Sequence, residues 1–321
     1  MKQPVRRITI IASGMIVLGI LLVAIGFFSG AKLSIIKTEN GLKAVGAEDR
    51  KHEEWVLKEF NSLEVDLADA DIEVIPSNQY KLEIDRMEGS EITQQVKNNT
   101  LIIKDKNSFP SITFSMNFSG AIQQTKIKVY LPNDVDFENV NITSNFGDVK
   151  MEGMTTSNFV VHSNDGEVLL GDIKSTKLTI VNKFGDISAS NVKADKLTIE
   201  INDGEADLSN MEIAENASLV NQFGDTNISE FISHGTKIES QDGDINIKGK
   251  LAGQTLIESS FGDVNLSLDN KESELSYDIQ NDFGEIIVDG TEMVAKASKS
   301  VNGEDILTVH SNDGDVVITL E

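Results

Sequence analysis

The stretch Asn145-Phe146-Gly147-Asp148 sets a pattern, a glycine followed by an acid, that returns throughout the second half of this 321-residue chain. The nine glycines are Gly147, Gly166, Gly185, Gly204, Gly224, Gly243, Gly262, Gly284 and Gly314. They are separated by 19, 19, 19, 20, 19, 19, 22 and 30 residues. A period this regular predicts a stacked repeat architecture in which these glycines are structural turn residues.

Apolar residues alternate on both sides of each glycine. They recur seven and five positions before it, as Val140 and Ile142, and two and four positions after it, as Val149 and Met151. This alternation predicts short strands with one buried face. The apolar residues stand at odd-numbered positions before the glycine and at even-numbered positions after it, so a straight strand could not bury both sets. We therefore expect the glycine to adopt a positive φ and bend the chain there. A third apolar position follows seven residues after the glycine, as Met154, Ile173, Val192, Met211 and Phe231.

Such a repeat is too short for a strand-helix-strand crossover and suits one coil of a parallel β-solenoid, or β-helix. We predict an all-β fold in which residues 140–321 form this solenoid, with coils about 4.8 Å apart. A sandwich or meander of hairpins stays open, because Phe-Gly and Asp-Gly are also turn signals. Residues 60–139 contain strands without the glycine phrase and predict an irregular β cap. We expect its apolar insertion at 107–121 to pack over the open end of the solenoid or to contact a partner or membrane.

The position before the glycine alternates between Phe and Asp, as in Phe146, Asp165 and Phe184. By strand parity we expect this position to face the interior or a corner, with each ring spreading across its neighbouring coils. The alternation breaks at Phe283, which follows Phe261 with no Asp between them. Stacking is expected to become irregular there.

The position after the glycine is always acidic. In-register stacking would align these carboxylates in a ladder formed by Asp148, Glu167, Asp186, Glu205, Asp225, Asp244 and Asp263 and continued by Glu285 and Asp315. Like charges about 4.8 Å apart repel by roughly 1 kcal/mol per pair in water. Three interpretations stay open: a solvated edge that opposes aggregation, a Ca²⁺ site, and an electrostatic receptor for a cationic peptide or envelope protein. No other metal or cofactor is expected.

The N-terminal region predicts export. Residues 1–7 form a basic tail, and residues 8–28 contain no charge and are long enough for a transmembrane helix. The positive flank predicts a cytoplasmic N-terminus and an extracellular C-terminal domain. A cleaved signal peptide is the alternative. Residues 29–59 are expected to form a stalk or linker, with a short helix or stalk near Trp55.

Composition narrows the function classes. With 52 acidic and 28 basic residues, net charge −24, the chain should repel nucleic acid. It lacks cysteine, which excludes disulfides, thiolate catalysis and a lipoprotein anchor. All four arginines lie outside the repeats, at positions 6, 7, 50 and 86, which disfavours a polysaccharide lyase. We therefore predict no catalytic residues.

Three features together resemble a known family. They are the run from Asp69 to Ser77, the segment Val129-Tyr-Leu131-Pro132, and the repeated Asn-x-Gly-Asp-Val units. This succession is similar to the β-strand-repeat "putative adhesin" domain of bacterial surface proteins, common in Gram-positive organisms, over about residues 60–321. The resemblance implies a non-enzymatic envelope protein acting in adhesion or in the response to envelope stress and antimicrobial peptides. A structural or adhesive rod is the alternative, and a polysaccharide-active enzyme the remote one.

Overall fold

A computed structural model describes residues 3–30, 32, 34–38, 41–88, 90–106, 114–115, 124–133 and 135–321. The apolar insertion at 107–121 thus lies outside the described residues, apart from two strand residues. The chain divides into two compact units. The first comprises Met1–Arg50, Met87–Ser90 and Ser111–Gln123, and the second comprises Lys51–Arg86, Glu91–Pro110 and Gln124–Glu321.

The first unit contains helix α1 (Gln3–Phe28) and a small antiparallel sheet. Its strands are β1 (Ser34–Thr38), β2 (Gly41–Val45) and β8 (Phe114–Ser115), and a 3-10 turn, η1 (Ala47–Asp49), follows β2 in the chain. Across the residues that the structure describes, no helix combines the length and apolarity that crossing a membrane requires.

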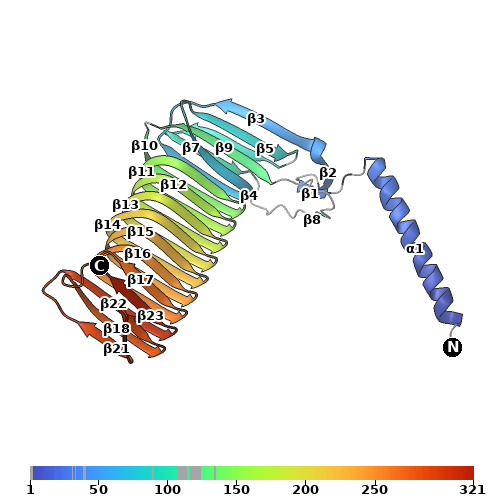
Figure 1. Cartoon of the computed structure of the whole chain (residues 1–321). Helices are drawn as coiled ribbons and strands as arrows, with labels where there is room; N and C mark the ends of the chain where they lie inside the picture. The colour runs from blue at the N-terminus through green and yellow to red at the C-terminus, as the bar shows by residue number, and fades with distance from the viewer. Residues whose placement is uncertain are drawn as a thin grey trace. The chain divides into compact units, whose positions relative to one another are not determined.

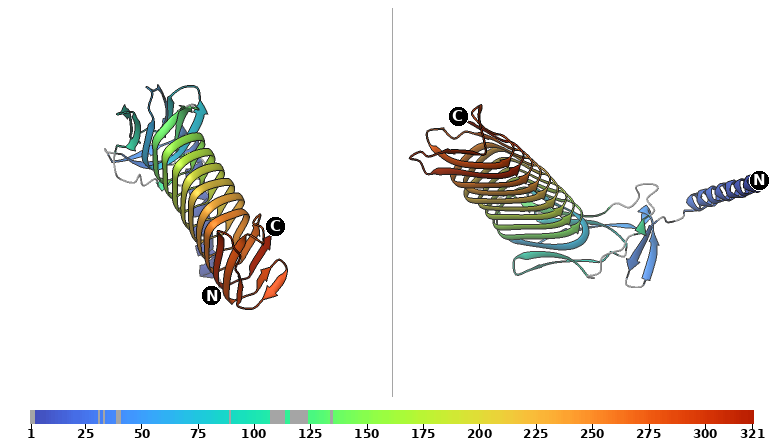
Figure 2. Two further views of the ribbon diagram at one scale, coloured as in Figure 1. Left: turned by 90° about the vertical axis from the view of Figure 1, so that its left-hand side faces the viewer. Right: turned by 90° about the horizontal axis from the view of Figure 1, so that it is seen from below.

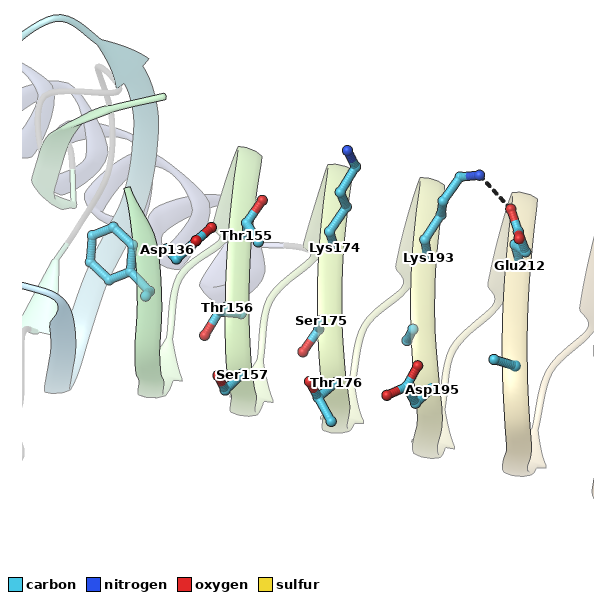
Figure 3. A pocket seen from close by; sticks show the side chains of 13 residues that line it. Asp136, Thr155, Thr156, Ser157, Lys174, Ser175, Thr176, Lys193, Asp195 and Glu212 are labelled. Carbon is cyan, nitrogen blue, oxygen red and sulfur yellow. Dashed lines mark hydrogen bonds and ion pairs between the residues drawn. The ribbon is translucent and has the colours of Figure 1, made fainter. Parts of the chain in front are cut away.

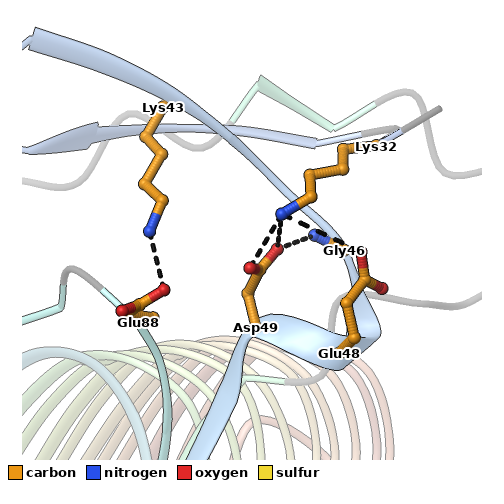
Figure 4. A network of polar contacts seen from close by, with 6 residues as sticks. All are labelled: Lys32, Lys43, Gly46, Glu48, Asp49 and Glu88. Atoms are coloured by element: carbon orange, nitrogen blue, oxygen red, sulfur yellow. Dashed lines mark hydrogen bonds and ion pairs between the residues drawn. The ribbon is translucent and has the colours of Figure 1, made fainter. Parts of the chain in front are cut away.

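A polar network ties this small unit together (Figure 4). The Asp49 carboxylate accepts hydrogen bonds from Lys32 Nζ at 2.6 and 2.8 Å and from the Gly46 N–H at 2.8 Å. The hydrogen bond from Lys32 is the main cause that lowers the pKa of Asp49. Lys43 Nζ lies 2.7 Å from the Glu88 carboxylate. These contacts fix the turn at η1 and explain its acidic residues structurally.

The second unit contains, ahead of the repeats, a long strand, β4 (Ser62–Ser77), which pairs in parallel with β7 (Thr100–Asp105) and β9 (Thr125–Pro132). Strand β6 (Ile92–Lys97) pairs with β7, β5 (Lys81–Met87) pairs with β9, and β3 (Arg50–Val56) pairs with β5. The helix or stalk expected near Trp55 is instead strand β3, and Trp55 packs against the core. Strand β4 pairs in parallel with the first repeat strands and supplies a coil of its own, although Ala70 replaces the glycine.

The repeats form a solenoid-like stack of bent strands (Figures 1 and 2). Its strands are β10 (Asp136–Phe146), β11 (Val149–Asp165), β12 (Val168–Phe184), β13 (Ile187–Asp203), β14 (Ala206–Phe223), β15 (Thr226–Asp242) and β16 (Ile245–Phe261). Each pairs in parallel with the next, so equivalent positions form columns along the stack, as Val149, Val168 and Ile187 do.

The predicted columns of core residues are confirmed. The positions seven and five residues before the glycine, such as Val140 and Ile142, are buried, and so is the third position, from Met154 to Phe231. The bend is confirmed as well, since Gly185 has φ 125°. A Cβ there would lie 2.5 Å from the Gly166 carbonyl oxygen, so the coils approach too closely at this corner for any side chain.

The last coils do not stack in chain order. After β16 the chain forms β17 (Val264–Leu268), β18 (Leu275–Phe283), β19 (Ile286–Val288), β20 (Thr291–Met293), β21 (Lys296–Lys299), β22 (Asp305–Asp313) and β23 (Val316–Leu320). Strand β22 pairs with β16 on one side and with β18 on the other. Likewise, β23 pairs with both β17 and β19. The final coil therefore lies between the two that precede it, which is the irregularity expected near Phe283.

Engineered cysteine pairs test this order, because the chain has no cysteine of its own. His310 lies in register with Glu258 on one side and Gln280 on the other. We expect E258C/H310C and Q280C/H310C to form disulfides, since neighbouring strands are about 4.8 Å apart. The matched pair E258C/Q280C spans two coils, about 9.6 Å, and should not close. Efficient closure of that pair in non-reducing gels would show stacking in chain order instead.

Candidate functional site

The phenylalanines before the glycines are exposed, so of the two expected locations the interior is wrong and the corner is confirmed. Their exposed fractions run from 45% to 72%, for Phe146, Phe184, Phe223, Phe261 and Phe283. The inside-outside alternation already ends before the glycine, because the residues one and two positions before it are both exposed, as Lys183 and Phe184 are. Large exposed apolar groups in a column are a common mark of an interaction surface.

These rings alternate strictly with aspartates once the coils are taken in spatial order. Going along the stack, the position before the bend is occupied by Asp69, Phe146, Asp165, Phe184, Asp203, Phe223, Asp242, Phe261, Asp313 and Phe283. The apparent break in the sequence disappears, because Asp313 of the inserted coil lies between Phe261 and Phe283. We call this row of residues the aromatic column.

A second column, immediately beyond the glycines, contains the predicted acidic ladder. Every aspartate of this column accepts a hydrogen bond from the backbone N–H of the equivalent acid in the next coil. Asp186 Oδ1 accepts from the Glu205 N–H at 2.8 Å, and Asp225 Oδ1 accepts from the Asp244 N–H at 2.9 Å. Glu167 and Glu205 accept no such bond among the described residues. We call this row the acid column, and the two columns together the corner ridge.

The inner side of the same corner is polar, a feature the sequence reasoning missed. Asn182, three residues before its glycine and 1% exposed, donates from Nδ2 to the carbonyl oxygens of Gly166 and Gly185, both at 2.9 Å. Asn221 and Asn281 make equivalent bonds in their coils. The sequence contained a signal for this polar layer, because the buried position three residues before the glycine holds Asn or Ser in nearly every repeat. These bonds satisfy carbonyl groups that the bend turns away from the strand ladder.

In the part of the chain that the structure describes, the carboxylates of the ridge are not paired with basic side chains. Within the described stack, no ion pair reaches the acid or aromatic column, whereas exposed pairs such as Lys193 with Glu212 form elsewhere. At the N-terminal end of the ridge, the pKa of Asp69 is raised by burial and then by the neighbouring Asp71 carboxylate. Among the described residues, no group of three or more acidic, His or Cys side chains is arranged to hold a metal ion.

A shallow groove of about 460 Å³ crosses another side of the stack. Thr155, Ser157 and Thr176 contribute hydroxyl groups to it, and Lys174 and Lys193 extend from neighbouring coils in the same direction (Figure 3). Lys193 pairs with Glu212 at the groove edge. Because its charges are of both signs and partly paired, this groove has weaker preference for a charged partner than the ridge has.

A known protein family and several solved structures match most of this chain. A family model described as "Toastrack DUF4097" matches residues 60–319. A "putative adhesin" from Parabacteroides distasonis shares 13% identity, with TM-score 0.43, over 84% of this chain and 96% of the other. One from Bacteroides fragilis shares 20% identity, with TM-score 0.36, over 85% and 97%. A protein named as lipid binding, from Parabacteroides distasonis, shares 13%, with TM-score 0.33, over 86% and 98%. No curated protein matches the chain.

The hydrogen bonds of the acid column allow charge and structure to be separated at Asp225. Asparagine keeps an oxygen in the same place, so D225N should retain the bond to the Asp244 N–H and stay within about 0.5 kcal/mol of the wild-type unfolding free energy. Glutamate keeps the charge but loses the bond, so D225E should cost about 1 kcal/mol. Denaturant unfolding measures both. Equal stability of D225E and wild type would contradict the assigned hydrogen bond.

Proposed function

We propose that this chain, which belongs to the Toastrack DUF4097 family, is a non-enzymatic protein of the bacterial cell envelope that binds cationic partners along its corner ridge. One observation carries the proposal: the ridge presents exposed rings and carboxylates in a regular row, and among the described residues none of these carboxylates forms an ion pair. The carboxylates in such a row repel one another, and a bound cationic partner would reduce that repulsion. The composition supports the same reading, since the net charge of −24 steers cations toward the stack.

The absence of a catalytic role is part of the proposal. It is supported by the sequence, where no arginine lies between residues 87 and 321 to stabilise developing negative charge beside the carboxylates. The aspartates also have an identified structural task, because they bind backbone N–H groups of the neighbouring coil. Binding or sensing requires only that the outer oxygens and rings stay accessible.

Location is the second part of the proposal. We infer that residues 8–28 anchor the chain in the cell membrane with Lys2, Arg6 and Arg7 in the cytoplasm and the stack outside. The support is the 21-residue run without charge and its basic flank. The large apolar side chains described in α1, such as Ile11 and Val23, are more than half exposed. That exposure suits contact with lipid.

Binding of poly-L-lysine to the full-length protein in detergent tests the binding role. We expect binding that weakens steeply as salt rises. The triple variant D186N/D225N/D263N keeps the hydrogen-bond acceptors and removes three charges. At low salt it should bind at least about tenfold more weakly, at about 0.5–1 kcal/mol per exposed pair.

The matched control removes three acids from a different side of the stack. E200Q/E239Q/E258Q changes the net charge equally and leaves the ridge intact. Equal losses in the two triple variants would mean that net charge alone attracts the probe. In that case the ridge is not the binding surface.

A further inference from the structure

The spacing and neighbours of the rings in the aromatic column define a repeating chemical unit. Phe184, for example, lies in register between Asp165 and Asp203, one on each neighbouring coil. The same arrangement holds for Phe223 between Asp203 and Asp242. Each unit is therefore an exposed ring whose two neighbouring strands, about 4.8 Å to either side, each carry an aspartate at the same position, and the unit repeats every two coils, about 9.6 Å.

An arginine side chain fits such a unit better than a lysine does. A guanidinium group stacks flat on an aromatic face while its edges donate to carboxylates, whereas an ammonium is a compact, strongly hydrated point charge. Phe184 is 48% and Phe223 45% exposed, so one part of each ring stays open to a ligand. Among the described residues, no cation–ring contact involves these phenylalanines, and the sequence has no arginine after Arg86.

The repeat distance also selects a backbone conformation for the ligand. A polyproline II helix has three residues per turn and about 3.1 Å rise, so every third residue returns to one side after about 9.3 Å. An α-helix returns after seven residues, about 10.5 Å, and a β-strand after two, about 6.8 Å. Over the four intervals from Phe146 to Phe283, polyproline II drifts from the rings by about 1 Å and the α-helix by about 4 Å.

We propose that the aromatic column binds an extended, arginine-containing peptide in polyproline II conformation, with one arginine on each phenylalanine. This inference rests on the proposed binding role of the ridge and names the chemistry of its partner. The rings supply selectivity for arginine and for a three-residue period. The flanking aspartates and the acid column supply attraction for any cation.

Three proline-rich peptides of similar length test the inference against the full-length protein in detergent. They are (Arg-Pro-Pro)₅, (Lys-Pro-Pro)₅ and (Arg-Pro-Pro-Pro)₄, all of which favour polyproline II. We expect the first to bind at least about tenfold more tightly than either of the others. That ratio corresponds to two or more stacked guanidinium groups at about 0.5–1 kcal/mol each. Calorimetry at one fixed salt concentration gives the ratios.

A ring variant identifies where the selectivity arises. F184L/F223L/F261L keeps apolar bulk at three exposed positions and removes the aromatic faces. It should bind (Arg-Pro-Pro)₅ and (Lys-Pro-Pro)₅ equally, with melting temperature unchanged. The control I232A alters an exposed apolar side chain away from the ridge and should keep the preference for arginine.

The outcomes separate this inference from the proposed function. If the arginine and lysine peptides bind equally to the wild type, yet D186N/D225N/D263N still weakens both, the arginine inference is overturned and the cationic receptor stands. If the four-residue period binds as well as the three-residue period, the polyproline II match is overturned. If no cationic probe depends on the ridge, both proposals fail.

Discussion

Close contact between identical positions of neighbouring coils is the constraint on which the rest of this structure depends. At the glycine corner, a carbonyl oxygen of one coil lies where a Cβ of the next would be, for example Gly185 O about 2.3 Å from a Cβ built on Gly204. That approach fixes the register, and a fixed register makes each side chain meet its equivalent about 4.8 Å away. Columns of apolar side chains are stabilised when identical side chains pack on one another. In columns of like charges or of large rings, the side chains repel or crowd one another, so these columns need a specific arrangement.

The corner shows three arrangements that meet this need. In the acid column, each aspartate accepts a hydrogen bond from an N–H group of the next coil. On the inner side of the corner, asparagines such as Asn221 donate hydrogen bonds to backbone carbonyl groups. In the aromatic column, phenylalanine rings alternate with aspartates. The last arrangement extends to the inserted C-terminal coil, where Asp313 separates Phe261 from Phe283. The ring-aspartate alternation is therefore maintained where the coils depart from chain order. As a result, the aromatic column stays periodic to the end of the stack.

The repeat, the bend and the core columns could be predicted from the sequence, because glycine spacing and apolar alternation are local signals. The outward direction of Phe184 could not, since parity counting assumes a straight strand up to the glycine. The position of coil 305–320 in the stack could not be predicted either, because a strand can pair in parallel with strands that are distant in the sequence. The break in the Phe/Asp alternation at Phe283 indicated where the stacking becomes irregular, but it did not show that a later coil is inserted there. The acid column was found as a ladder, while the hydrogen bonds of Asp186 and Asp225 required coordinates.

Amide hydrogen exchange, resolved residue by residue along the acid column, tests most directly whether the corner is a preformed and rigid surface. The account predicts slow exchange for the amides of Glu205, Asp244 and Asp263, each bonded to an aspartate of the preceding coil. The amides of Asp186 and Asp225 follow a glutamate in the stack, receive no such bond in the described structure, and should exchange faster. Uniform exchange along the column, or the reverse pattern, would contradict the account.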